Sequence, residues 1–175
     1  MIMRPLIIRR LTTVRRRANL TPKINRKVVN ATEVEYDGIK FRSKIEGRVY
    51  LILKDNGFVP EYETEKIILL PQLRPSHAWY LDGVPQITKK GRINIVKSKE
   101  YTPDFKLQIG NTTVYLEVKG HPNDVYPVTR KLFLRWIEEQ DRSIIFSEVH
   151  SIRGLNKFME VLKQLKNDNK QESRV

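Results

Sequence analysis

The sequence feature that most constrains the fold is a pair of extended segments joined by two turn-forming residues. The first segment runs from Tyr101 to Ile109 and the second from Thr112 to Lys119, with Gly110-Asn111 between them. A two-residue connection of this kind is typical of an antiparallel β-hairpin, because it suits the natural twist of the two strands. We therefore expect a hairpin over residues 101–119, against which the other elements pack.

Helices and further strands are expected on both sides of this hairpin. Ser43 is a suitable N-cap, with Glu46 at capping-box spacing, for a helix that ends at Asn56-Gly57. Apolar periodicity predicts two later helices, over 126–140 and 152–165. Val128, Leu132, Trp136 and Ile137 lie near one face of the first of these. Extended segments are expected at 58–70 and 143–146. This order predicts an α/β fold, a mixed β-sheet flanked by helices on both faces.

The positive charge of the chain is concentrated at its N-terminus. The chain has 33 Lys and Arg against 20 Asp and Glu, a formal net charge of +13, which favours a polyanionic partner such as nucleic acid. Nine of the basic residues lie in residues 1–32, which contain no Asp or Glu. We therefore divide the chain into a basic N-terminal arm (1–32), a domain (33–166) and a polar tail (167–175). Within the domain, residues 71–99 are expected to form an inserted loop or hairpin.

The basic arm has three interpretations. It is a disordered, solubilising or ribosomal-type extension, a phosphate-binding arm, or a transit peptide of the mitochondrial type. A phosphate-binding arm would gain affinity by releasing counterions from DNA. In that interpretation the DNA-binding residues of the arm are Arg9, Arg10, Arg15, Arg16 and Arg17.

Several classes of protein are excluded by composition. The chain has no cysteine, which excludes disulfide scaffolds, cysteine zinc sites and thiol catalysis. Its longest uncharged run, from Leu107 to Leu116, is far shorter than the ~20 residues of a membrane span. No signal-peptide pattern is visible. We therefore expect no membrane association and a cytoplasmic location.

The predicted hairpin carries the residues with the clearest chemistry. Asp104 lies on one strand, and Glu117 and Lys119 lie two residues apart on the other, so that both project from the same face. Two close carboxylates stay ionised most readily with a cation between them, and Mg²⁺ suits a site with few protein oxygens. The Val118 carbonyl and Glu46 are further candidate ligands. The alternative is a solvated strand face with a weak ion pair.

Three short strings carry a resemblance to a known family. They are FRSKIE on the first helix, YTPDF on the first strand and YLEVKG on the second. Together they resemble the PD-(D/E)xK nuclease superfamily, which implies a restriction-endonuclease-like core over roughly residues 41–147. Within it the chain is similar to small phage endonucleases: junction resolvases of the endonuclease I type, the endonuclease subunit of heteromeric transposases and head-completion nucleases. Position by position, the resemblance implies that Glu46, Asp104 and Glu117 bind Mg²⁺, with Mn²⁺ as a substitute, and that Lys119 is the catalytic lysine.

The resemblance implies a metal-dependent endonuclease that hydrolyses phosphodiester bonds in branched, packaged or replicating DNA. The alternative is a virion-assembly or structural DNA-binding protein in which catalysis is secondary or absent. A homodimer, phage head or neck proteins as partners, and a location in the host cytoplasm or in the virion remain open. Further candidates for DNA contact are Lys44, Arg48 and Lys131, with solvated helix faces as the alternative. Trp79, Tyr80 and Trp136 are candidates for base stacking, although Trp136 at helical spacing is more typical of a core residue.

Overall fold

The structure is a computed structural model that describes residues 32–88, 90–120 and 125–172. Every element given below belongs to the unit Ala31–Val175. The candidate DNA-binding residues of the basic arm, Arg9, Arg10, Arg15, Arg16 and Arg17, lie outside the described residues. No helix in the described ranges is long and apolar enough to cross a membrane.

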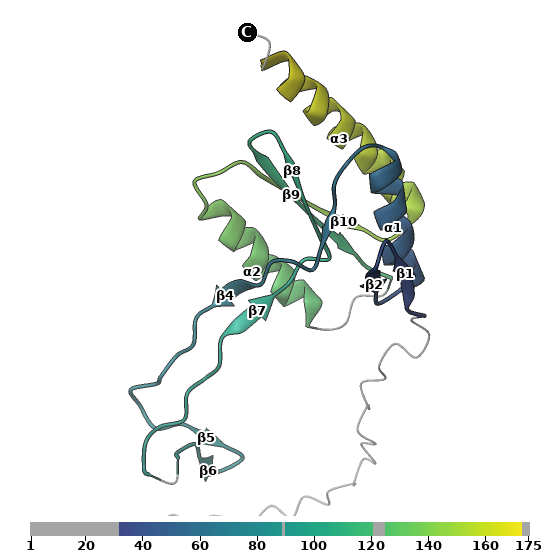
Figure 1. Cartoon of the computed structure of the whole chain (residues 1–175). Coiled ribbons are helices and arrows are strands. Elements are labelled where there is room, and N and C mark those ends of the chain that lie inside the picture. The colour runs from purple at the N-terminus through teal and green to yellow at the C-terminus, as the bar shows by residue number, and fades with distance from the viewer. Residues whose placement is uncertain (1–31, 89, 121–124, 173–175) are drawn as a thin grey trace, which may run out of the picture. The chain divides into compact units, whose positions relative to one another are not determined.

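A four-stranded mixed sheet forms the centre of the described unit (Figure 1). Its strands, in spatial order, are β10 (Ile144–Val149), β9 (Thr112–Val118), β8 (Phe105–Ile109) and β3 (Glu61–Tyr62). β8 and β9 form the expected antiparallel hairpin, in which Ile109 pairs with Thr112, and Gly110 has a positive φ of 56°. β10 runs parallel to β9, and β3 runs antiparallel to β8. The expected mixed sheet is therefore confirmed.

Helices cover both faces of this sheet (Figure 1). Helices α1 (Lys44–Asp55) and α3 (Ile152–Glu172) share one apolar core with β8 and β9, and α2 (Tyr126–Glu138) packs on the other face. Successive side chains of β9 point to opposite faces of the sheet. Leu116 belongs to the core shared with α1 and α3, and Tyr115 belongs to the core under α2. All seven residues of β9 are buried, so this strand is the centre of the fold. The expected α/β architecture is confirmed.

Helix α1 begins and ends where the sequence predicts. The Ser43 side chain caps its first turn by accepting a hydrogen bond from the Glu46 N–H at 3.3 Å. Asn56 is the C-cap, and Gly57 follows with a φ of 73°. A small hairpin of β1 (Val34–Tyr36) and β2 (Ile39–Phe41) packs on α1. Gly47 allows this close approach, since a Cβ there would lie 2.6 Å from the Val34 side chain.

Two expectations, one about a strand boundary and one about a helix face, are wrong. The strand expected over 101–109 is split: Tyr101 ends β7 (Lys99–Tyr101), which pairs with β4 (Ile67–Leu70), and β8 starts only at Phe105. Pro103, which has no N–H to donate, lies at the change of partner. Val128 is 59% exposed, because α2 instead buries its aromatic side toward Tyr115, led by Phe133.

The polar tail expected from residue 167 is helical as far as Glu172. Tertiary contacts hold this part of α3 in place. The Lys166 ammonium donates to the Gly57 carbonyl at 2.7 Å, and the Asn169 amide donates to the Ile109 carbonyl at 3.4 Å. A polar sequence therefore stays helical here because it caps the ends of two other elements.

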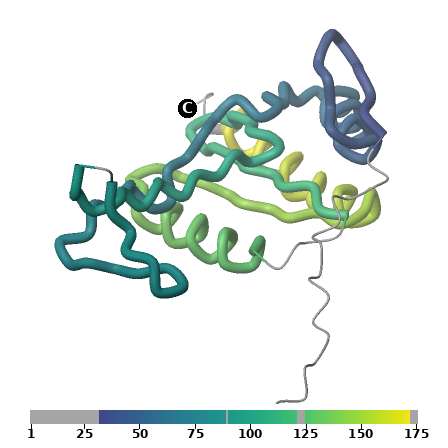
Figure 2. Tube along the Cα trace, turned by 90° about the horizontal axis from the view of Figure 1, so that it is seen from below, coloured from purple at the N-terminus to yellow at the C-terminus, as the bar shows by residue number. Residues whose placement is uncertain are grey.

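Residues 71–99, which we call the ribbon, extend from the paired strands β4 and β7 (Figure 1). The ribbon contains antiparallel pairing of its own, through the bridges Leu73–Val96 and Ile87–Ile93 and the short hairpin of β5 (Tyr80–Leu81) and β6 (Val84–Pro85). Seen from below, the ribbon lies at the end of the sheet opposite the β1–β2 hairpin (Figure 2).

Candidate active site

The candidate site lies at the end of the β8–β9 hairpin that is distant from its turn. Asp104 directly precedes β8, and Glu117 lies near the end of β9. The Val118 N–H donates a 2.7 Å hydrogen bond to Oδ2 of Asp104, which fixes that carboxylate against the partner strand. Antiparallel pairing of Phe105 with Leu116 therefore brings Asp104 beside Glu117, as the hairpin pattern predicts.

Glu117 is the most deeply buried carboxylate of the site, with 2% of its surface exposed. Its Oε2 accepts a 2.6 Å hydrogen bond from the Tyr101 hydroxyl. Its Oε1 forms an ion pair with the ammonium of Lys119, which follows β9. The same ammonium lies 4.6 Å from the ring centroid of Tyr126 on α2. Lys119 is thus held by one carboxylate and one aromatic face, with part of its side chain open to solvent.

Glu46 reaches the site from α1. One carboxylate oxygen accepts hydrogen bonds from the Tyr62 hydroxyl at 2.6 Å and the Arg42 N–H at 3.1 Å. The other accepts from the Ser43 hydroxyl at 2.7 Å. Glu46 is 9% exposed, and both oxygens of its carboxylate accept hydrogen bonds from residues of β3 or from the start of its own helix.

The carboxylates of the site repel one another. Burial, followed by the nearby charge of Glu117, raises the pKa of Asp104 to about 8, and the charge of Glu46 acts in the same direction. The hydrogen bond from the Val118 N–H and the positive charge of Lys119 only partly offset this rise. A buried carboxylate whose pKa lies this far above its ordinary value is typical of a functional site.

A fourth carboxylate, Glu63, belongs to the same neighbourhood and was missed by the sequence interpretation. Its pKa is raised by burial and by the charges of Glu46 and Glu117, although Arg42 opposes the rise with an ion pair of 2.6 Å. Glu63 has a positive φ of 49°, which is uncommon outside glycine, and its N–H donates to the Asp104 carbonyl. Since Glu61, Glu63 and Glu65 alternate in sequence, no local signal singled out Glu63.

A second cluster adjoins the site on β10. Glu148 lies in register with Glu117 on the neighbouring strand, and it binds Arg130 at 3.0 Å and His150 at 2.7 Å. Burial opposes ionisation, but hydrogen bonds from Arg130 and Tyr126 lower the pKa of Glu148. The two adjacent basic residues on α2 are both exposed, and of the two it is Arg130 that contacts this cluster.

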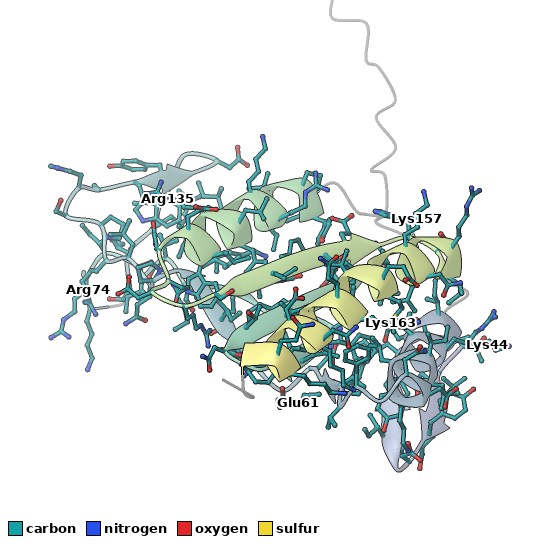
Figure 3. The ribbon with its side chains drawn as sticks, turned by 90° about the horizontal axis from the view of Figure 1, so that it is seen from above. Lys44, Glu61, Arg74, Arg135, Lys157 and Lys163 are labelled. Atoms are coloured by element: carbon teal, nitrogen blue, oxygen red, sulfur yellow. The ribbon has the colours of Figure 1, made fainter. Side chains whose placement is uncertain are left out.

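The other expected DNA-contact residues are distributed over the surface. Lys44 and Arg48 are exposed on α1, and Figure 3 shows Lys44 projecting outward. Trp136 packs in the aromatic core with a stacked Phe133, as its helical spacing predicts. Trp79 and Tyr80 both lie in the ribbon, and Tyr80 is 63% exposed.

The residues present fit a divalent cation in part. Asp104 and Glu117 supply the oxygen ligands that Mg²⁺ prefers, and their mutual repulsion is what a cation between them would relieve. In the ranges 32–88, 90–120 and 125–172, however, no three His, Asp or Glu side chains are grouped closely enough to hold a metal ion. The charge of Glu46 helps to raise the pKa of Asp104, but the Glu46 carboxylate itself accepts hydrogen bonds from the Tyr62 and Ser43 hydroxyls.

Comparison with known proteins identifies a family without assigning it an activity. Neither the curated proteins nor the solved structures that were compared contain a match. Residues 26–151 match the model of a family described as a protein of unknown function, DUF1064. This match contains β1 through β10 and all the candidate site residues named above, from Arg42 to His150. Because the match spans more than half of the chain, the protein belongs to the DUF1064 family.

Proposed function

We propose that this protein is a metal-dependent DNA endonuclease with a PD-(D/E)xK core. The observation that carries the proposal is the arrangement of Asp104, Glu117 and Lys119 at one end of the β8–β9 hairpin. Two buried carboxylates repel each other there, and the partly exposed Lys119 contacts one of them. A purely structural core gains nothing from such repulsion, whereas a site that binds a cation does.

The residues have separate roles in this proposal. Asp104 and Glu117 would hold the divalent ion, with the Val118 carbonyl and Glu46 as further ligands, and the ion would supply Lewis-acid chemistry. The Tyr101 hydroxyl orients Glu117 through its 2.6 Å hydrogen bond. Lys119 orients the attacking water or balances charge on the phosphate. Water then adds to phosphorus, the bond to the 3′ oxygen breaks, and a proton reaches the departing oxygen.

The substrate class in this proposal is DNA of the kinds that phage-type nucleases process, namely branched, packaged or replicating DNA. Charge supports a nucleic acid, since the whole chain carries +13. Lys44 and Arg48, which are exposed on the helix that carries Glu46, would be further contacts to backbone phosphates in this proposal.

A cleavage assay tests the proposal. Supercoiled plasmid and four-way junctions are incubated with wild type, Lys119→Ala and Lys106→Ala, in Mg²⁺, in Mn²⁺ and in EDTA. Lys106 is a matched control, because it lies on β8 of the same hairpin and pairs with Glu65 at 2.9 Å. We expect metal-dependent cleavage that falls by about 10²–10⁴ in Lys119→Ala and persists in Lys106→Ala. Intact substrates with wild type in both metals would refute the proposal.

The second candidate function is DNA binding without catalysis, as in a virion-assembly protein. Two observations favour it: no three-ligand group is formed within the described ranges, and the Lys119 ammonium is already paired with Glu117. Thermal unfolding separates the two candidates. The nuclease proposal expects Mg²⁺ to raise the Tm of wild type but not of Glu117→Gln, because a ligand stabilises only a protein that binds it. A Tm that does not respond to Mg²⁺ or Mn²⁺ supports the second candidate.

A further inference from the structure

The ribbon, residues 71–99, accounts for the net positive charge of the chain outside the basic arm. It contains six Lys and Arg and one Asp. The rest of the chain after the basic arm, residues 33–70 and 100–175, contains 18 Lys and Arg against 19 Asp and Glu. The excess of positive charge outside the basic arm is therefore a property of the ribbon.

Four basic side chains of the ribbon are exposed and form no ion pair within the described residues. Arg74, Lys90, Arg92 and Lys97 are exposed, and none forms an ion pair with a carboxylate of the described residues. By contrast, the exposed cations Arg42, Lys54 and Lys66 each contact a carboxylate within 3.2 Å. Unpaired cations gathered on one projecting element leave a positive surface that only an external anion can neutralise.

The ribbon also exposes apolar and aromatic side chains at its own short hairpin. Tyr80 and Leu81 are each 63% exposed and Val84 is 59% exposed. They flank the turn at Asp82-Gly83, where both residues have positive φ. These side chains belong to neither apolar core, so the fold gains little burial from them. An aromatic side chain among exposed cations is a common composition of nucleic-acid-binding surfaces.

We propose that the ribbon is a DNA-binding element that lies along the phosphate backbone of a duplex and holds it for the candidate site. This inference rests on the proposed endonuclease function and names the element that binds its substrate. A two-stranded antiparallel ribbon has the dimensions of an element that enters a DNA groove. A second copy of the chain is disfavoured as the occupant, because two ribbons with this charge repel each other.

Binding of a fluorescent blunt duplex, measured by anisotropy in EDTA, tests the ribbon without cleavage. The ribbon variant is Arg74→Gln/Lys90→Gln/Arg92→Gln in the full chain. Its control is Lys157→Gln/Lys163→Gln/Lys170→Gln, which removes the same charge from α3. Figure 3 shows Arg74 on the ribbon, away from α3 with Lys157 and Lys163. The basic arm is present in every protein compared, so it contributes equally to each.

We expect the ribbon variant to lose about 10-fold or more in affinity, with a salt slope lower by about 2–3, because each lost phosphate contact lowers the slope by about 1. The α3 control should bind like wild type. Equal binding by both variants, or a larger loss in the control, overturns the inference. A ribbon variant that binds DNA normally but changes from dimer to monomer in sedimentation also overturns it, and identifies the ribbon as an interface between copies.

The same proteins separate this inference from the endonuclease proposal. If wild type binds duplex through the ribbon but leaves DNA intact in Mg²⁺ and Mn²⁺, the nuclease proposal fails and the ribbon inference holds. If the ribbon variant binds and cleaves like wild type, the ribbon inference fails and the nuclease proposal holds. A wild type that binds no duplex refutes the ribbon inference directly.

Discussion

The β8–β9 hairpin and the ribbon are both antiparallel pairs built around short turns, yet they differ in what covers them. Every residue of β9 is buried between α2 on one face and α1 and α3 on the other. The ribbon exposes Tyr80, Leu81 and Val84, and among the described residues β5 and β6 make their extensive contacts with each other. Backbone pairing is therefore similar in the two regions, whereas the burial of side chains is opposite.

This difference is what the two proposals use. In the hairpin, burial raises the pKa of Asp104, and Glu117 pairs with Lys119, which is the setting that the proposed chemistry at a phosphate would use. In the ribbon, exposure leaves cations hydrated and unpaired, which is the setting for contact with a polyanion. The two regions are expected to respond differently to substitution, and the predictions below test this.

The largest expected effect compares a buried leucine with an exposed one. Leu116 on β9 is fully buried, and Leu81 on the ribbon is 63% exposed. Leu116→Ala should lower the free energy of unfolding by about 2–5 kcal/mol through lost contacts and a cavity. Leu81→Ala should change it by less than about 0.5 kcal/mol. Urea denaturation of both variants measures this, and a loss for Leu81→Ala comparable to that for Leu116→Ala would mean that the ribbon packs against the core.

The next effect concerns the buried carboxylate pair. In metal-free protein, the raised pKa of Asp104, about 8 in the folded state, lies above the ~3.9 of an unfolded chain. The folded state therefore binds a proton that the unfolded state has lost. The stability that this proton contributes is complete below pH ~4, falls as the pH rises, and is gone above pH ~8.

Asp104→Asn removes this titration while keeping an oxygen that accepts from the Val118 N–H. In EDTA, wild type should therefore lose about 4 kcal/mol relative to Asp104→Asn between pH 5 and pH 8, at about 1.4 kcal/mol per pH unit. Chemical denaturation at each pH measures the difference. A constant difference across this range would show that Asp104 is ionised throughout and that Glu117 does not oppose its charge.

The smallest effect tests how Glu46 is held. The Tyr62 hydroxyl donates a 2.6 Å hydrogen bond to this carboxylate, so Tyr62→Phe should cost about 1–3 kcal/mol of unfolding free energy. Tyr80→Phe on the ribbon is the control, and it should cost less than about 0.5 kcal/mol because its side chain is exposed. Thermal unfolding of the two variants gives the comparison, and equal Tm values would contradict a structural role for the Tyr62 hydroxyl.

Local signals in the sequence predicted the elements on which the candidate site stands. The turn at Gly110-Asn111 predicted the hairpin, and Ser43 and Asn56-Gly57 predicted both ends of α1, because turn and cap preferences depend on a few adjacent residues. The pairing of Asp104 with Glu117 followed from the register of that hairpin. These predictions required no knowledge of distant contacts.

Other features depended on contacts between residues far apart in the chain. Tyr101 leaves the hairpin to pair with β4, Glu63 joins the site across β3 and β8, and α3 continues to Glu172 because its last turns contact Gly57 and Ile109. No short window of sequence contains both partners of these contacts, so periodicity and capping rules cannot find them.

The residue types of the site, its hairpin and its first helix were therefore readable from the chain alone, since they follow from turns, caps and alternation over a few residues. The charge state of Asp104, the inclusion of Glu63 and the exposure of the ribbon arise only on folding. Burial and the distances between carboxylates set the first two. The exposure of the ribbon depends on which surfaces the helices cover. The sequence of a strand shows which residues share a face, but it does not show what packs on that face.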